Sequence, residues 1–344
     1  RMRELSVQSA NDTNTAADRN NINAEAQQLI SEVNRVAETT TFNGMNILDG
    51  SFTGKQFQIG ADSGQTLNVA VDSAAASDIG AHTSKTDVQI SAAGETDSQI
   101  AGDDGSGTNY FYTVSGSAGE QSVTVDNGAS ARDLADAING VTAATGVEAT
   151  ATTKAGLTLD AADTISFSLG NENGEQVSIG DVVVTDASDL RGVRDAVNAV
   201  SGRTGISATM GETNATVILT DQNGDDIGIE NFESGAGDKT LTVESLQADG
   251  SSKDGGAATT GINDTGSVYV TGQIEMTSAK AFSVTADHTT AAETFLESNS
   301  SSELETVADI DLTTAQGATD AIKVLDVALQ KISESRSDLG AVSN

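Results

Sequence analysis

Apolar residues recur at alternating spacings of four and three near both ends of this chain, which is typical of a helical heptad seam. Near the N-terminus the pattern predicts one long helix over residues 18–38, capped by Asp18, after an earlier helix that ends near Gln8. The seam positions of the long helix are Ile22, Ala26, Leu29, Val33 and Val36. Near the C-terminus the same spacing selects Ile322, Leu325, Leu329, Ile332 and Leu339.

A stripe this narrow cannot stabilise an isolated helix, because helical peptides are marginal without tertiary contacts. We therefore expect the two ends of the chain to pack on each other as an antiparallel bundle or coiled coil, with everything between them inserted into it. The alternative is a pair of unrelated amphipathic helices in separate domains. The predicted fold class is α+β and multidomain, with β-rich α+β outer domains inserted into a helical core.

Between residues 40 and 71 the pattern changes from helical spacing to turns and alternation. Asn43-Gly44 and Asp49-Gly50 are turn pairs, and apolar residues alternate with a period of two in KQFQIG and QTLNVAV. These features predict a β-hairpin attached to the bundle. We accordingly expect a core domain formed by residues 1–83 and 301–344, and variable outer domains over residues 84–300.

The middle of the chain contains an internal repeat. ADAINGVTAATGVEAT from Ala135 and RDAVNAVSGRTGISAT from Arg194 are identical at 8 of 16 positions. Each copy, within residues 130–153 and 189–212, predicts a helix, a turn at Thr-Gly and then a strand. Further strands are predicted in the β-type runs QSVTV, GDVVVTD, ATVILTD, KTLTV and GSVYVTG. The repeat indicates an α+β unit built twice.

The formal net charge of −34 argues against nucleic acid and against an anionic membrane surface as partners. No cysteine is present, so disulfides, thiolate zinc sites and cysteine nucleophiles are excluded. The chain also lacks an apolar run of the roughly 20 residues that span a bilayer. A chain without thiols or prolines suits a protein that travels unfolded and folds outside the cell.

Candidate catalytic and metal-binding motifs are few. Neither His82 nor His288 lies in an HExxH arrangement, so both are expected to be ordinary surface histidines. There is no GxSxG nucleophile motif and no phosphate-binding glycine loop between a strand and a helix. We therefore predict that the chain is not an enzyme, and we assign it no cofactor.

Two pairs of carboxylates, Asp103-Asp104 and Asp225-Asp226, lie in Gly-rich turns. The segment DQNGDDIGIENF, which begins at Asp221, resembles the first half of a calcium loop, but Phe232 stands where the bidentate glutamate is required. We expect a turn between strands there, and no metal site.

The terminal segments resemble bacterial flagellin, the subunit of the flagellar filament. The resemblance is carried by RELSVQSAN, TTFNG, ILDG and SRSDLGAV, which occur together and in this order at the two ends of the chain. The repeated DLADAINGVTAATGV and VRDAVNAVSGRTGI also look like the insert motif in the variable region of many flagellins. This resemblance covers the ends and the repeat, and leaves the rest of the middle unassigned.

The resemblance implies a rod-like helical core domain, a solvated variable middle and an extracellular flagellar filament as the site of action. It implies type III export of the unfolded chain, self-association into the filament, an export chaperone and a filament cap as partners. Flagellins also carry terminal inner-tube helices that this sequence does not contain. We therefore expect a truncated fragment that does not polymerise by itself.

The resemblance further implies that the core domain is a ligand of Toll-like receptor 5. The positions that match the family's receptor-contact motif are Arg1 and Leu5 in RMREL and Glu25 in NAEAQQ. A purely solvated helix face, or a face packed against neighbouring filament subunits, is the competing interpretation.

Two other functions remain open from the sequence. A hook–filament junction protein shares the helical ends. The outer domains could instead act as an adhesin or glycan-binding module, for which Tyr110, Phe111 and Tyr112 offer a stacking surface, although aromatic residues in a strand more often belong to a core.

Overall fold

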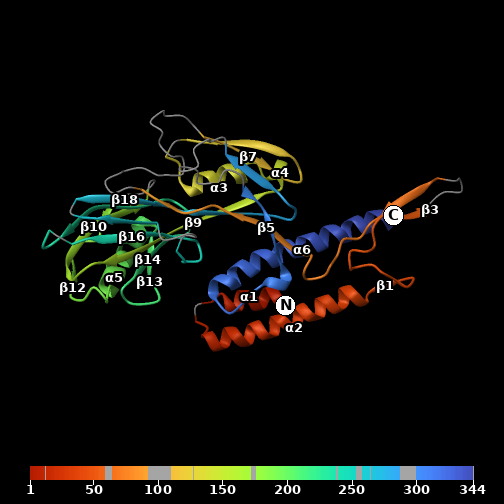
Figure 1. Ribbon diagram of the computed structural model, residues 1–344, viewed down its shortest axis with the longest axis horizontal. Coiled ribbons are helices and arrows are strands. Elements are labelled where there is room, and N and C mark those ends of the chain that lie inside the picture. Colours follow the sequence, from red (N-terminus) through yellow and green to blue (C-terminus); the bar gives the residue numbers. More distant parts are fainter. Residues whose placement is uncertain are drawn as a thin grey trace. The chain divides into compact units, whose positions relative to one another are not determined.

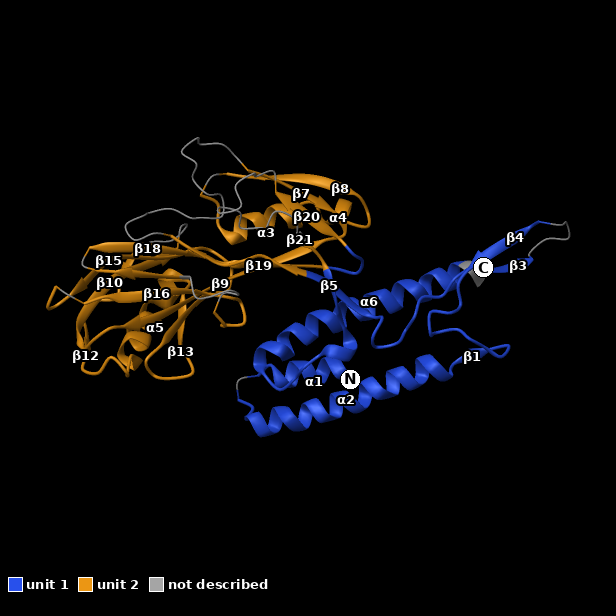
Figure 2. Ribbon diagram, viewed as in Figure 1, with its two compact units in different colours: residues 1–83, 278–281, 303–344 blue, residues 84–277, 282–302 orange. Residues whose placement is uncertain are grey.

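The computed structural model describes residues 1–11, 13–58, 64–91, 110–126, 128–171, 176–237, 239–252, 258–263, 265–286 and 300–343. The chain divides into two compact units, which Figure 2 shows in different colours. Unit 1 comprises residues 1–83, 278–281 and 303–344, and unit 2 comprises residues 84–277 and 282–302. The mixture of helices and sheets agrees with the predicted α+β class.

Unit 1 contains the helices at the two ends of the chain. The long ones are α2 (Ala16–Thr39) and α6 (Ala315–Ser343), and the short ones are α1 (Met2–Ser9) and the 3₁₀ helix η1 (Val307–Asp309). Helix α1 packs against both α2 and α6 and runs antiparallel to them, whereas α2 and α6 run in the same direction (Figure 1). The two ends of the chain therefore pack antiparallel through α1 and α6.

The N-terminus of α2 differs in detail from the sequence prediction. Thr15 is the N-cap, and Asp18 occupies the third helical position of a capping box. The Thr15 hydroxyl donates to the Asp18 carboxylate at 2.6 Å, and the Asp18 backbone N–H donates to the Thr15 hydroxyl at 3.2 Å. Hydrogen bonds from Thr15 hold the pKa of Asp18 below its usual range. The sequence prediction of Asp18 as the N-cap is thus wrong, because the N-cap is Thr15, about one helical turn earlier.

Short strands complete unit 1. Hairpin β1–β2 turns at Asn43-Gly44, where both residues have positive φ as a two-residue turn requires. A second hairpin joins β3 to β4, and residues 80–83 of β5 pair with β22. The strand bounds are β1 (Thr41–Phe42), β2 (Met45–Asn46), β3 (Lys55–Gln58), β4 (Thr66–Val69), β5 (Gly80–Lys85) and β22 (Glu303–Thr306).

Unit 2 is organised around β9 (Glu148–Leu159), a strand of 12 residues that contributes to two hydrophobic cores. The first half of β9 pairs with β19, and the second half lies between β14 and β16. The sheet that contains β9 also includes β13 (Ser207–Met210), β14 (Val217–Asp221), β16 (Leu241–Leu246), β17 (Ala258–Ile262) and β19 (Gln273–Ser278), besides β5 and β22.

A second sheet of unit 2 has the order β11-β10-β15-β18-β6, with β12 also paired to β10. Its strands are β6 (Gln89–Ile90), β10 (Asp163–Asn171), β11 (Val177–Ser178), β12 (Val182–Val184), β15 (Ile227–Ser234) and β18 (Gly266–Thr271). Side chains of this sheet, of the β9 sheet and of α5 (Arg191–Thr204) form one core, which includes the fully buried Phe167 and Phe232. The five β-type runs noted in the sequence all form strands.

A third sheet of unit 2 has the order β21-β20-β7-β8 (Figure 2). Its strands are β7 (Tyr110–Ser115), β8 (Glu120–Val125), β20 (Ser283–Ala286) and β21 (Ser300–Ser301). One face of this sheet shares a core with α3 (Ala131–Asn139) and with the first half of β9. The short helix α4 (Thr142–Thr145) leads from α3 towards β9.

The internal repeat is a repeated structure. In the first copy α3 and the short helix α4 are followed by Gly146, and in the second copy α5 is followed by Gly205. Both glycines have φ +76°, and both precede a strand. The side-chain amide of Asn139 donates to Ala149 O and accepts from Ala149 N–H, both at 2.8 Å. Asn198 makes the same two bonds to Ala208, also at 2.8 Å. The identical asparagine therefore fastens each helix to the strand that follows it, which explains why the repeat keeps this residue.

Candidate functional site

The residues predicted to contact a receptor lie on α1 and α2 of unit 1. The guanidinium of Arg1 pairs with the carboxylate of Glu25 at 3.1 Å and with that of Glu4 at 3.2 Å. The Arg1 and Glu25 side chains are 60% and 49% exposed, so this pair is available at the surface. Arg3 on the same helix pairs with Asp326 of α6 at 3.1 Å, which ties α1 to the C-terminal helix.

Leu5 does not share this surface. Its side chain is only 2% exposed and belongs to the core of unit 1 together with Ile22 and Leu325. The structure therefore corrects the sequence prediction for this residue, because a side chain enclosed by three helices offers no contact area to a partner. Its place is structural, since it anchors α1.

The predicted bundle seam is buried in part. Ile22, Ala26 and Leu325 are buried, and Leu29, Val33, Ile322 and Ile332 are partly exposed. The predictions for three seam residues are wrong, because these side chains are exposed by 37–55%: Val36, Leu329 and Leu339. The sequence reading missed five buried residues: Ile30, Ala37, Ala321, Val324 and Ala328.

The helical period explains why the predicted seam and the buried residues differ. Buried positions on α2 fall at residues 22, 26, 30 and 37, which follow the 3.6-residue period of a straight helix more closely than a strict heptad. The short helix α1 also packs on only part of the length of α2 and α6. Apolar residues that it does not cover remain at the surface.

Two of these exposed residues, Val36 and Leu329, border an apolar groove of about 310 Å³ within unit 1. Val36 and Ala37 line it from α2, and Leu325, Leu329 and Ile332 line it from α6. Among the described residues that line it, Glu32 is the one charged side chain. Exposed apolar surface that is contiguous in this way is typical of a protein–protein contact.

His82 differs from the exposed histidine that the sequence predicts, whereas His288 lies outside the described residues. His82 is partly buried on β5, and its Nδ1 atom has no hydrogen-bond partner among the residues that the structure describes. Burial, and secondarily the positive charge of Lys331, lowers the pKa of the His82 imidazole.

This environment predicts a pH dependence of unit 1. Because the pKa of His82 is lower in the folded chain than in the unfolded chain, its contribution to stability is present above about pH 6.5 and is lost as the pH falls. We expect His82→Gln to lose less stability than the unaltered chain between about pH 7.5 and pH 5.5, measured by circular dichroism of thermal unfolding. Identical pH profiles of the two chains would contradict this role.

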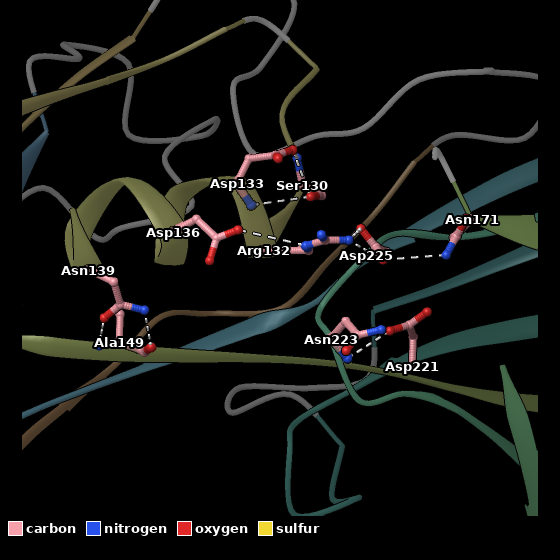
Figure 3. Close-up of polar contacts among 10 residues, drawn as sticks. All are labelled: Ser130, Arg132, Asp133, Asp136, Asn139, Ala149, Asn171, Asp221, Asn223 and Asp225. Carbon is pink, nitrogen blue, oxygen red and sulfur yellow. Dashed lines mark hydrogen bonds and ion pairs between the residues drawn. The ribbon is translucent and has the colours of Figure 1, made fainter. Parts of the chain in front are cut away.

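In unit 2 the acidic turn between β14 and β15 is buried. Asp221, Asp225 and Asp226 are each no more than 2% exposed. The Arg132 guanidinium of α3 donates to both Asp225 carboxylate oxygens, at 3.1 and 3.2 Å (Figure 3). Asp221 accepts from the Asn223 backbone N–H at 2.8 Å, and burial raises the pKa of its carboxyl group. A turn between strands was predicted here and is confirmed.

The chemistry of this turn is that of an internal ion pair. The Arg132 guanidinium already occupies the position on Asp225 that a cation would take. Within the described parts of the chain, no group of three His, Asp or Glu side chains is placed to hold a metal ion. Asp103 and Asp104 lie outside the described residues.

Neither unit therefore presents a reaction centre among its described residues, and the accessible features are surfaces. The exposed Arg1–Glu25 pair and the apolar groove of unit 1 are surfaces of the kind that contact other proteins. Across the described helices, none is long and apolar enough to cross a membrane.

The family profile described as "Bacterial flagellin N-terminal helical region" matches residues 1–53, and the one described as "Flagellin hook IN motif" matches residues 113–163. The B-type flagellin of Pseudomonas aeruginosa is 29% identical over 350 residues, which cover 100% of this chain and 68% of that protein. The polar flagellin C of Vibrio parahaemolyticus is 49% identical over 78 residues, which cover 23% of this chain and 20% of that protein. These matches support bacterial flagellin as the family that the chain resembles.

Among solved structures, the chain is similar to FliC from Burkholderia pseudomallei, with 19% identity and a TM-score of 0.36 over 100% of this chain and 91% of that one. It is also similar to FlgL from Xanthomonas campestris, with 13% identity and a TM-score of 0.27 over 99% of this chain and 81% of that one. The IN motif match falls on the first copy of the repeat, which contains Asn139.

Proposed function

We propose that this chain is the core and outer part of an extracellular flagellar filament subunit, which serves motility by non-covalent self-association. The observation that carries the proposal is the flagellin N-terminal helical region, matched over residues 1–53 and folded here into helices α1 and α2. Unit 1 would be the filament core domain, and unit 2 would be the variable outer region. An export chaperone and a filament cap would be its partners in assembly.

The apolar groove of unit 1 supports self-association. Val36 and Leu329 are 42% and 55% exposed in the isolated chain. Each carries apolar area whose removal from water would stabilise an assembled state at about 25 cal/mol per Å². The described lining of this groove is apolar except for Glu32, which favours a protein contact over a small polar ligand.

The test places aspartate in the groove. We expect a flagellin that carries Val36→Asp and Leu329→Asp to be exported but to form few or no filaments in a strain that lacks its own flagellin, because two charges would be buried at the contact. Val183→Asp is the matched control, since Val183 is 70% exposed on β12 of unit 2. Filaments of normal length and number from the groove variant, seen by electron microscopy, would refute the proposal.

We further propose that unit 1 binds Toll-like receptor 5 through the Arg1–Glu25 pair. Their ion pair positions a guanidinium and a carboxylate side by side on the exposed faces of α1 and α2. Leu5 would support this surface from beneath, because its burial fixes α1 against α2 and α6.

A charge substitution tests the receptor contact. We expect Glu25→Ala to weaken binding to the receptor ectodomain by about tenfold, which is typical of a lost charged contact. Glu32→Ala is the control on the same helix, because Glu32 is 54% exposed and pairs with Arg35. Equal affinities of the two variants in surface plasmon resonance would eliminate Glu25 as a contact.

A further inference from the structure

The outer face of the β21-β20-β7-β8 sheet carries an exposed aromatic ring among hydroxyl side chains, and filament assembly does not explain this feature. Side chains alternate across a strand, and on β7 the alternation separates the three consecutive aromatic residues. Tyr110 and Tyr112 are 4% and 2% exposed and belong to the core beneath the sheet. Phe111 points to the opposite face and is 48% exposed. The stacking surface suggested by the sequence is therefore reduced to one ring.

Hydroxyl side chains surround that ring in register. Phe111 lies opposite Thr124 of β8, and in the next row Thr113 lies between Ser122 of β8 and Thr285 of β20. In a further row Ser115 lies between Glu120 and Ser283, and Ser283 lies opposite Ser301 of β21. Adjacent strands are about 4.8 Å apart, so the second and third rows present hydroxyl groups at that interval. In the third row the Ser115 hydroxyl donates to the Glu120 carboxylate at 2.8 Å.

The face is hollowed beside the ring. A depression of about 560 Å³ is lined by Phe111, Thr113, Ser122, Thr285 and Ala286. Each of the three hydroxyl groups in this lining can both donate and accept a hydrogen bond. Among the described residues, none of these three hydroxyls makes a hydrogen bond to another side chain, so all three are available to a ligand.

We propose that this face of unit 2 binds a neutral oligosaccharide, with one sugar ring stacked on Phe111 and its neighbours hydrogen-bonded along the rows of hydroxyl groups. A pyranose ring has an apolar face of C–H groups that packs on an aromatic ring, whose faces are negative, and a rim of hydroxyls that donate and accept. One exposed ring among hydroxyl rows provides both kinds of contact.

The negative charge of the chain and the small apolar area of this face favour a neutral oligosaccharide over anionic ligands and over a protein partner. Among the described residues of the three rows, Glu120 is the one charged residue, and the chain carries a net charge of −34, so sialylated, sulfated or phosphorylated ligands would be repelled. A protein partner would require a wider apolar centre than a single ring, because the cores of protein interfaces are rich in aromatic residues and depleted of serine. The proposal does not depend on filament assembly, because it concerns unit 2 alone.

The test titrates the chain with neutral hexasaccharides of glucose, mannose, galactose and N-acetylglucosamine by isothermal calorimetry, with sialylated and sulfated oligosaccharides as further arms. We expect at least one neutral hexasaccharide to bind with a Kd of about 1 mM or tighter. Phe111→Ala should weaken that binding by about tenfold, since an aromatic contact contributes up to this factor. Thr113→Val combined with Thr285→Val should weaken it as well, because the hydroxyls are lost while the side-chain shape is kept.

Phe57→Ala is the matched control, because Phe57 is an aromatic residue of similar exposure, 43%, on the β3–β4 hairpin of unit 1. We expect it to leave the affinity unchanged. Unfolding curves of all variants, followed by tyrosine fluorescence, verify that unit 2 remains folded. The proposal is overturned by an absence of binding to every neutral hexasaccharide, by binding of the anionic oligosaccharides only, or by equal losses in Phe111→Ala and Phe57→Ala.

Discussion

Replacing Arg132 with methionine is expected to lower the free energy of unfolding of unit 2 by about 3 kcal/mol, the lower end of the cost of leaving a buried charge without its partner. The Asp225 side chain is 3% exposed, and the Arg132 guanidinium donates to both of its carboxylate oxygens. Methionine keeps much of the apolar stem and removes the charge. The lower end applies because the Arg132 side chain is itself 44% exposed, so water can partly replace it.

The unfolding of unit 2 can be followed separately, because the tyrosines of the chain lie in this unit. Tyr110, Tyr112 and Tyr269 are the three tyrosines of the chain, and all belong to unit 2, while tryptophan is absent. Tyrosine fluorescence during denaturant unfolding therefore reports on unit 2. Arg191→Met is the control, because Arg191 and Asp189 form an exposed pair whose loss costs less than about 1 kcal/mol.

A double substitution separates the charge from other effects of the change. Adding Asp225→Asn to Arg132→Met removes the uncompensated carboxylate, so most of the lost stability should return. If Arg132→Met costs no more than Arg191→Met, the buried ion pair does not stabilise unit 2 in the way its geometry indicates.

The second large effect is expected in unit 1. Leu5→Ala should lower the free energy of unfolding of unit 1 by about 2–4 kcal/mol, the usual cost of truncating a fully buried leucine. Leu5 is 2% exposed, whereas Val7 on the same helix is 50% exposed. Val7→Ala should therefore cost less than about 0.5 kcal/mol and serves as the control. Far-ultraviolet circular dichroism follows the unfolding, because the two longest helices of the described chain, α2 and α6, belong to this unit.

The expected instability of Leu5→Ala makes this variant unsuitable for testing receptor binding. If Leu5→Ala displaces α1, it also displaces Arg1, and a loss of affinity in that variant would report on folding. Glu25→Ala changes the surface without opening the core, because its carboxylate is 49% exposed. Equal stabilities of the Leu5→Ala and Val7→Ala chains would contradict the packing role of Leu5.

Local features were predicted well from the sequence. Turn chemistry at Asn43-Gly44, the two long terminal helices and the five β-type runs all form as expected, because propensity and periodicity depend on near neighbours along the chain. The internal repeat also forms twice, and the shared Asn139 and Asn198 could have been identified from it as the residues that fasten helix to strand.

Contacts between distant segments were not predictable in the same way. Arg132 and Asp225 are 93 residues apart, and neither carries a local signal that names the other. The partner of Asp225 follows from the packing of α3 beside the β14–β15 turn, which only the folded chain establishes. The calcium-like spacing from Asp221 was recognisable in the sequence, but the guanidinium that neutralises it was not.

The sequence by itself determined the main elements of this protein, their order and its resemblance to flagellins, because all of these depend on short-range patterns along the chain. Only the tertiary structure decided which apolar residues face inward. Leu5 is buried because α1 packs against both long helices, Val36 and Leu329 are exposed because α1 is too short to cover them, and Phe111 is separated from Tyr110 and Tyr112 by the pleat of one strand. Burial is a property of what packs against a residue, and that depends on segments far away in the chain.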